Sequence, residues 1–144
     1  MRSEELATSR QAEEAGELPI HTDRDLLSAR HAVRTAAVAE GFDLIGQTKL
    51  VTAASELVRN AYIHGNGGGL TILPLTGPGG RRGLRLIVRD DGPGIPDLDA
   101  ALADGFTTGT GLGHGLGGTR RLVDEFDIDS TERGTTVVVT RWTT

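Results

Sequence analysis

The stretch DGFTTGTGLGHGLGG, from Asp104 to Gly118, is almost half glycine. Glycine loses more backbone freedom on folding than any other residue, so a dense cluster of glycines is costly in a folded protein. The stretch is either a flexible linker or a loop whose backbone must approach something closely. Leu112 and His114 alternate with the glycines, and a segment patterned like a helix follows them. This arrangement favours the loop.

A glycine loop that runs directly into a helix is a typical anion site. The backbone N–H groups before the helix N-terminus, together with the helix dipole, attract phosphate. The stretch lacks the Gly-Lys-Ser/Thr sequence of a Walker A loop, and no βαβ unit surrounds it as in a dinucleotide-binding fold. The sequence therefore predicts a triphosphate loop of a different kind.

The overall composition indicates an ordinary globular protein. The chain has 144 residues, 37% of them hydrophobic, a net charge of −5 and no cysteine. The acidic balance argues against a nucleic-acid partner, because phosphate contacts need clustered Lys and Arg. No apolar run is long enough to span a membrane, and the first residues do not resemble a signal peptide. We expect a cytoplasmic protein with no membrane partner, a disordered tail over residues 1–16 and a single domain over residues 17–144.

Hydrophobic periodicity predicts the secondary structure. Thr22 and Asp25 form a capping-box pattern ahead of the first helical stretch. Strands are expected at residues 17–22, 69–75, 83–90, 127–130 and 134–142, and helices at 26–40, 47–64 and 115–126, with a short helical stretch at 97–103. This order lacks the strict alternation of a parallel sheet. It predicts an α+β fold, a two-layer α/β sandwich with the helices on one face of a mixed, mostly antiparallel sheet.

Two polar side chains share one face of the second expected helix. Glu56 and Asn60 are four residues apart, at the edge of the apolar stripe. A carboxylate and an amide oxygen that point together into a cleft suit a divalent cation and a proton-transfer site. The alternative is a structural one, in which Glu56 pairs with Arg59, His64 or another cation.

A second polar motif, RDDGPGIPD, follows the strand at residues 83–90. Asp90 ends this strand, and Gly92 and Gly94 leave room for a flat ligand above the sheet. A carboxylate held at a strand end can accept a hydrogen bond from an exocyclic amine. Asp91 is its neighbour, and the Gly-x-Gly spacing favours Asp90. The alternative is a surface hairpin, for which Asp-Gly is common.

The order of these motifs is more specific than any one of them. Residues 55–64, 90–94, 109–116 and the Gly-Thr pair at 134–135 resemble, in this order, the conserved boxes of the GHKL ATP-binding superfamily. That superfamily includes gyrase, ninety-kilodalton heat-shock chaperones, histidine kinases and mismatch-repair ATPases. The resemblance covers about residues 18–142 and implies the Bergerat ATP-binding fold.

The resemblance also implies ATP and Mg²⁺ as cofactors and assigns roles to residues. Glu56 is the expected general base, Asn60 the expected Mg²⁺ ligand, and Asp90 the acceptor for the adenine amine. His64 is included as a phosphate neighbour, with a purely structural histidine as the alternative. The implied nucleotide-binding set comprises Asn60, His64, Asp90, Gly92, Gly94, Gly109, Thr110, Gly111, Leu112, Gly113, His114, Gly115, Leu116 and Thr135.

Within the superfamily, the chain is most similar to small anti-sigma-type serine/threonine kinases, in particular the stressosome switch kinases. The phrases AASELVRNAY and GTTVVVTRW carry this likeness, together with the motifs above. It implies phosphorylation of a STAS-domain protein in a bacterial sigma-factor or stress pathway, with a PP2C-type phosphatase or a sigma factor as further partners. An anti-sigma factor that sequesters a sigma factor under ATP control is the main alternative, and an ATP hydrolase is the third.

Overall fold

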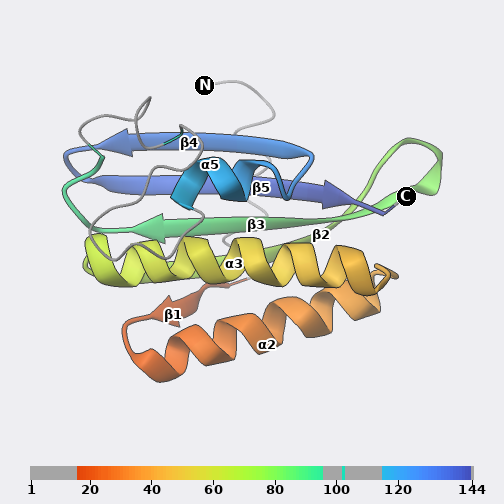
Figure 1. Cartoon of the computed structure of the whole chain (residues 1–144), viewed down its shortest axis with the longest axis horizontal. Coiled ribbons are helices and arrows are strands. Elements are labelled where there is room, and N and C mark those ends of the chain that lie inside the picture. Colours follow the sequence, from red (N-terminus) through yellow and green to blue (C-terminus); the bar gives the residue numbers. More distant parts are fainter. Residues whose placement is uncertain (1–15, 96–101, 103–114, 144) are drawn as a thin grey trace.

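The fold is a curved sheet with its helices on one side (Figure 1). The computed structural model describes residues 16–95, 102 and 115–143. Residues 1–15 of the tail expected over residues 1–16 lie outside the described residues. Within them, the strands are β1 (Leu18–Ile20), β2 (Gly68–Thr76), β3 (Arg82–Asp90), β4 (Glu125–Thr131) and β5 (Gly134–Trp142), and the helices are α2 (Asp23–Ala39), α3 (Leu44–His64), α5 (Gly115–Arg120) and the short 3-10 turn η1 (Pro78–Gly80).

Local capping signals set where the two long helices begin. Thr22 Oγ1 accepts the Asp25 N–H at 3.1 Å, and Asp25 Oδ2 accepts the Thr22 N–H at 3.0 Å, which completes the expected capping box of α2. The backbone N–H groups of His21 and Thr22 lower the pKa of Asp25, because they stabilise its charged form. Helix α3 starts at Leu44 rather than at residue 47, because Asp43 Oδ1 accepts the Gly46 N–H at 2.8 Å and caps the helix earlier.

The strands form one sheet in the order β1-β2-β3-β5-β4. Each neighbouring pair in this order is antiparallel, so the expected mostly antiparallel sheet is confirmed, without a parallel pair among the described strands. The register sets Asp90 of β3 opposite Gly68 on one side and opposite Thr135 on the other. Three segments that are far apart in sequence therefore meet at this end of the sheet.

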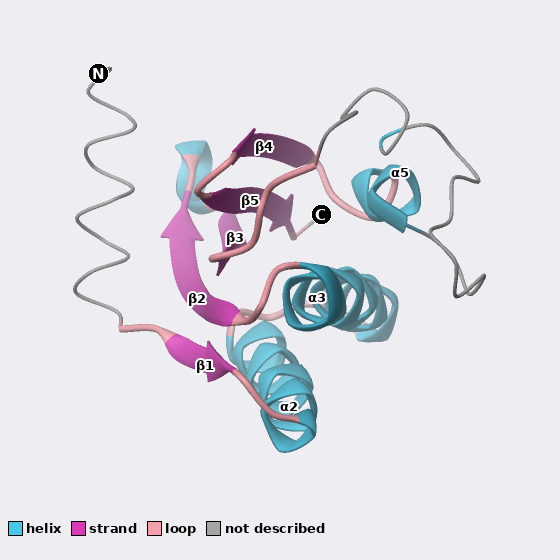
Figure 2. Cartoon of the chain, turned by 90° about the vertical axis from the view of Figure 1, so that its left-hand side faces the viewer, coloured by secondary structure: helices cyan, strands magenta, loops and turns pink. Residues whose placement is uncertain are grey.

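Alternation along the strands explains the two layers. Leu84, Leu86 and Val88 of β3 are buried, whereas Arg85 and Arg89 point to the opposite face and stay half-exposed. Figure 2 shows that α2, α3 and α5 lie on the same side of the sheet. The aliphatic core between the layers includes Val33, Leu50, Leu57, Leu70, Leu86, Leu116 and Val139. The expected α+β sandwich is confirmed.

The last helix is shorter than the sequence predicted. We expected it over residues 115–126, but α5 ends at Arg120 and β4 begins at Glu125. The alternation of EFDIDST, with Phe126, Ile128 and Ser130 half-buried and their neighbours exposed, places this segment in the sheet beside β5. Of the helical stretch expected at 97–103, only Leu102 lies within the described residues; it is helical and packs against the core.

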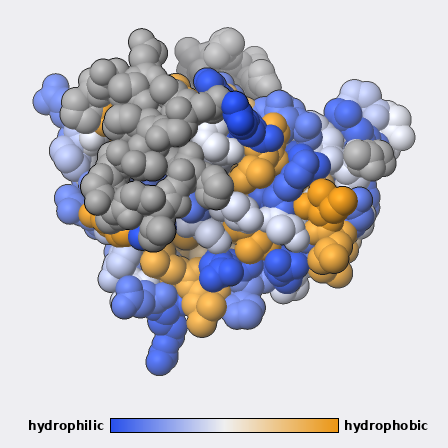
Figure 3. Space-filling model, in the orientation of Figure 1, coloured by the Kyte–Doolittle hydropathy of each residue, from blue (hydrophilic) through white to orange (hydrophobic). Residues whose placement is uncertain are grey.

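The face that carries the helices presents hydrophobic side chains among hydrophilic ones (Figure 3). The large apolar side chains exposed in the described part of the chain are Leu18, Leu27, Val38, Leu44, Ile45 and Ile63. Among the described helices, none combines the length and the apolar character that a membrane span needs.

Candidate functional site

The candidate site begins where the end of α3 meets the end of β3. Gly65 caps α3, and its carbonyl accepts the Asp91 N–H at 3.2 Å, while the Gly67 carbonyl accepts the same N–H at 3.1 Å. A Cβ on Gly65 would collide with the Asp90 carboxyl group, with Oδ2 at 2.6 Å. The glycine-rich end of α3 therefore allows the helix backbone to lie directly against Asp90.

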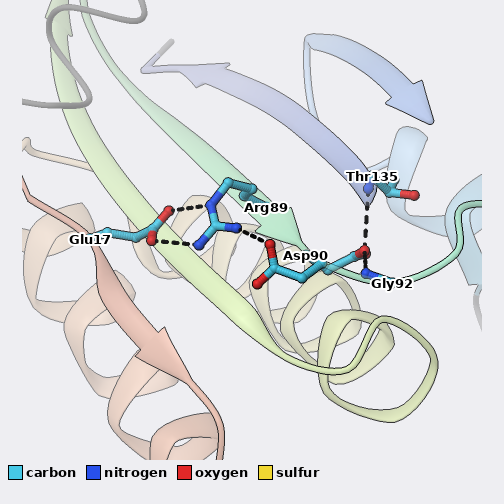
Figure 4. Close-up of polar contacts among 6 residues, drawn as sticks. Glu17, Arg89, Asp90, Gly92 and Thr135 are labelled. Atoms are coloured by element: carbon cyan, nitrogen blue, oxygen red, sulfur yellow. Dashed lines mark hydrogen bonds and ion pairs between the residues drawn. The ribbon is translucent and has the colours of Figure 1, made fainter. Parts of the chain in front are cut away.

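Asp90 is held by backbone donors on one carboxylate oxygen. Its Oδ1 accepts the Gly92 N–H at 2.9 Å and the Thr135 N–H at 3.2 Å (Figure 4). Its Oδ2 has no hydrogen-bond partner among the described residues. The carboxylate is thus held through Oδ1, and its Oδ2 is an acceptor that suits a ligand amine.

The two glycines of the Gly-x-Gly motif lie close to backbone. A Cβ on Gly92 would come within 2.5 Å of the Gly65 Cα, and one on Gly94, whose φ is +87°, would collide with the Thr131 carbonyl. Any larger residue at either position would push the turn away from α3 or from the β4–β5 hairpin. The structure therefore places Gly92 against Gly65 and Asp90, and Gly94 against the β4–β5 hairpin.

A hydroxyl pair joins this turn to the sheet. Ser130 Oγ accepts the Ile95 N–H at 2.8 Å and lies 2.7 Å from Thr135 Oγ1. Thr135 is buried. Its hydroxyl contacts Ser130, and its backbone N–H donates to Asp90. The sequence motifs included Thr135 but missed Ser130. The only sequence signal for Ser130 is its inward position in the alternation of β4.

Asp91, the residue after β3, is exposed and forms part of a surface ion cluster. Arg89 Nη1 donates to Asp91 at 2.6 Å, and the same guanidinium binds the Glu17 carboxylate at 3.0 and 2.9 Å (Figure 4). The hydrogen bonds that Arg89 donates to Glu17 raise the pKa of Arg89 above its usual value, against the opposing effect of burial, and the charges of Glu17 and Asp91 add to the rise. Asp91 is therefore bound in a surface ion cluster, whereas Asp90 takes no part in this cluster.

Glu56, Asn60 and His64 lie along α3 toward the same end. At 1.5 Å per residue, Asn60 and Glu56 are roughly 7 and 14 Å from Gly65 along the helix axis. Glu56 and Asn60 are half-buried, whereas His64 is exposed. The carboxylate of Glu56 makes no ion pair or hydrogen bond within the described residues, so the structural alternative of a partner such as Arg59 has no support there.

The glycine loop itself lies mostly outside the described residues. This applies to Gly109, Thr110, Gly111, Leu112, Gly113 and His114. Gly115 begins α5, and the side chain of Leu116 is buried in the core against α3 and the sheet. The loop therefore ends on a helix that the core anchors.

The candidate site residues fall into two groups, one around Asp90 and one on α3. At one end, a fixed carboxylate oxygen and glycine backbone suit a flat ring that carries an amine. Along α3, the side chains of Glu56 and Asn60 supply a carboxylate and an amide oxygen, which suit a proton acceptor and a hard divalent cation. The residues present thus fit a nucleotide with its Mg²⁺.

Comparisons with known proteins show the family to which the chain is similar. The family model described as histidine kinase-, DNA gyrase B-, and HSP90-like ATPase matches residues 46–143. Serine/threonine-protein kinase RsbT of Bacillus subtilis (strain 168) is 40% identical over 124 residues, which are 85% of this chain and 92% of that protein. Anti-sigma F factor of Bacillus licheniformis is 39% identical over 101 residues, which are 65% of this chain and 68% of the factor.

A solved structure shows the same fold. The crystal structure of the RsbU and RsbW domains of Rv1364c from Mycobacterium tuberculosis superposes with a TM-score of 0.57 and 23% identity. The match covers 86% of this chain and 30% of that one. The chain belongs to the family of histidine kinase-, DNA gyrase B- and HSP90-like ATPases.

Proposed function

We propose that this chain is an ATP- and Mg²⁺-dependent serine/threonine protein kinase that phosphorylates a STAS-domain regulator in a bacterial partner-switching pathway. The observation that carries the proposal is the Asp90 end of the site, where Oδ1 is held by two backbone N–H groups and Oδ2 remains for an amine. The 40% identity to the kinase RsbT over most of both chains supports the reaction class.

The adenine end of the site depends on fixed groups. Asp90 accepts the adenine amine, while Gly92, Gly94 and Gly65 keep side chains out of the plane of the ring. Thr135 lies beside Asp90 and is the second polar group at the base. Binding at this end costs little ordering, because hydrogen bonds within the chain already hold these groups.

The phosphate end depends on side chains of α3. Asn60 would hold Mg²⁺ through its amide oxygen, and the ion would supply charge neutralisation at the phosphates. Glu56 accepts the proton of the incoming serine or threonine hydroxyl. The hydroxyl oxygen bonds to the γ-phosphorus of ATP, and the bond between the γ-phosphorus and the oxygen that leaves with ADP breaks. The glycines of residues 109–115 contribute backbone N–H groups to the phosphates.

The test combines nucleotide binding with phosphate transfer. The purified chain is titrated with ATP in the presence of Mg²⁺ and is then incubated with γ-labelled ATP and each member of a panel of STAS-domain proteins. We expect saturable ATP binding and label on a serine or threonine of one STAS protein. The absence of ATP binding would contradict the proposed function.

A second function, sequestration of a sigma factor under ATP control, is favoured by the 39% identity to an anti-sigma F factor. The same experiment separates the two when sigma factors are included in a pull-down with and without ATP. A chain that retains a sigma factor and labels no STAS protein is an anti-sigma factor rather than a dedicated kinase.

A further inference from the structure

Ser130 joins three segments of the site through one hydroxyl group. It lies on β4 opposite Thr135 of β5, and its Oγ accepts the Ile95 N–H at 2.8 Å. The same oxygen lies 2.7 Å from Thr135 Oγ1. Thr135 in turn donates its backbone N–H to Asp90 Oδ1 at 3.2 Å. Ser130 thus connects the residue after the Gly-x-Gly turn with the residue that holds the adenine-binding carboxylate.

We propose that Ser130 is a positioning residue for recognition of the adenine base. It acts through Thr135 and Ile95, which set the orientation of Asp90 and the height of the glycine turn. The inference rests on the proposed binding of ATP and adds a residue to the part of the site that distinguishes one base from another.

The hydrogen-bonding capacity of a hydroxyl supports this role. A serine hydroxyl has one proton and two acceptor positions. The Ile95 N–H uses one acceptor position, and the short contact with Thr135 uses the proton or the second acceptor position. Loss of the hydroxyl leaves the Ile95 N–H and the Thr135 hydroxyl without this partner, and a polar group that loses its partner seeks another arrangement.

Loss of the Ser130 hydroxyl should change the orientation of the Asp90 carboxylate rather than its charge. Thr135 N–H and Gly92 N–H together hold Oδ1, which leaves Oδ2 as the acceptor for a ligand. When Thr135 and the turn before Ile95 are free to shift, Oδ2 is no longer held where a base amine can reach it. Recognition of the 6-amino group therefore weakens more than binding of the rest of the nucleotide.

Thr131 provides a matched control in the same hairpin. Its Oγ1 accepts the Arg133 N–H at 3.1 Å, and its side chain is exposed. The variant T131A removes a hydroxyl next to Ser130 that serves only this local turn among the described contacts. The variant S130T keeps the hydroxyl and adds a methyl group that a strand tolerates.

The experiment measures the dissociation constants of ATP and of purine riboside 5′-triphosphate, which lacks the 6-amino group, by calorimetry. The wild-type protein should bind ATP more tightly than the purine analogue. In S130A we expect roughly three- to tenfold weaker ATP binding, the size of one hydrogen bond, with the analogue changed less than about twofold. S130T and T131A should keep the wild-type ratio of the two constants.

Each outcome decides a separate question. A wild-type protein that binds neither nucleotide refutes the proposed function itself. A wild-type protein that prefers ATP, with an unchanged ratio in S130A, refutes the role of Ser130 and leaves the function intact. Equal weakening of both ligands in S130A also refutes it, because that is the result of general loosening. If S130A does not fold, S130C keeps the side-chain size with a weaker hydrogen-bonding group, and the same ratio decides.

Discussion

The two ends of the candidate site differ in how firmly the chain holds its polar groups. At the Asp90 end, three hydrogen bonds between 2.7 and 3.2 Å tie Gly92, Ser130 and Thr135 into one network with the carboxylate. On α3, Glu56 and Asn60 have no polar partner within the described residues and are held only by the helix that carries them.

This difference is consistent with two functions, base recognition at the Asp90 end and binding of the metal and phosphates on α3. A base is recognised by fixed donors and acceptors, so groups that are held in place before binding improve selectivity. A cation needs oxygen ligands, and a transferred proton needs a carboxylate whose pairing with another cation does not compete. The comparison predicts that changes on α3 affect catalysis and metal binding, whereas changes around Asp90 affect base recognition and stability.

The largest expected effect is that of Glu56→Gln. The amide keeps the size of the side chain but cannot accept the substrate proton, so phosphate transfer to a STAS protein should fall by roughly 10²- to 10⁴-fold. ATP affinity should stay within about twofold of wild type. Single-turnover transfer and calorimetry measure the two quantities, with Glu132→Gln at the exposed hairpin turn as the control. Transfer at the wild-type rate would exclude Glu56 as the base.

Asn60→Ala should have the next largest effect, on metal-dependent binding. Even residues that only support a metal ligand contribute about 10- to 100-fold to metal affinity, so loss of a direct ligand should weaken Mg-ATP binding at least about tenfold. Binding of ATP in EDTA should differ little between Asn60→Ala and wild type, which serves as the internal control. Unchanged affinity in the presence of Mg²⁺ would remove Asn60 from the metal site.

Gly65→Ala should disturb the Asp90 end through a collision. The new methyl group overlaps the Asp90 carboxyl, and such overpacking costs about 1–3 kcal/mol in the free energy of unfolding. ATP affinity should fall as well, because Asp90 must move. Gly79→Ala is the control: its φ of +72° strains the backbone by about 1–2 kcal/mol, but nothing lies near the new methyl group. Urea unfolding and calorimetry should show both variants destabilised and only Gly65→Ala impaired in ATP binding.

The sequence predicted the sheet because its signals are local, and the same local signals carry the prediction of the site residues. Alternation marked β3 and β5, and the Gly-x-Gly spacing selected Asp90 over Asp91. The start of α3 was missed because the cap at Asp43 stands before a glycine, Gly46, which weakened the helical pattern. Ser130 was missed for a different reason, since its partner Ile95 is 35 residues away and only the fold brings the two together.

The end of α5 illustrates how tertiary context overrides a local pattern. Residues 121–126 continue a helical spacing of apolar side chains, yet Glu125 and Phe126 pair with Thr140 and Val139 of β5. The backbone hydrogen bonds of an edge strand and the half-buried position of Phe126 outweigh two further turns of helix. The choice between helix and strand for this segment cannot be predicted from local sequence, because it depends on the strand with which the segment pairs.

The smallest expected effect is that of Glu17→Gln, which tests whether Asp90 is held without the neighbouring ion pair. Arg89 binds Glu17 beside Asp90, but both side chains are about 40% exposed, and exposed ion pairs contribute only about 0–1 kcal/mol. Glu17→Gln should therefore lower the free energy of unfolding by less than about 1 kcal/mol, with an effect that shrinks at high salt, and should change ATP affinity by less than about twofold. Glu40→Gln is the control, because its partner Arg82 lies 2.8 Å away in an ion pair at the far end of β3 from Asp90. A tenfold loss of ATP affinity in Glu17→Gln but not in Glu40→Gln would contradict this prediction. The network of Gly92, Ser130 and Thr135 would then be insufficient to hold Asp90, and the orientation of Asp90 would also depend on the residue that precedes β1.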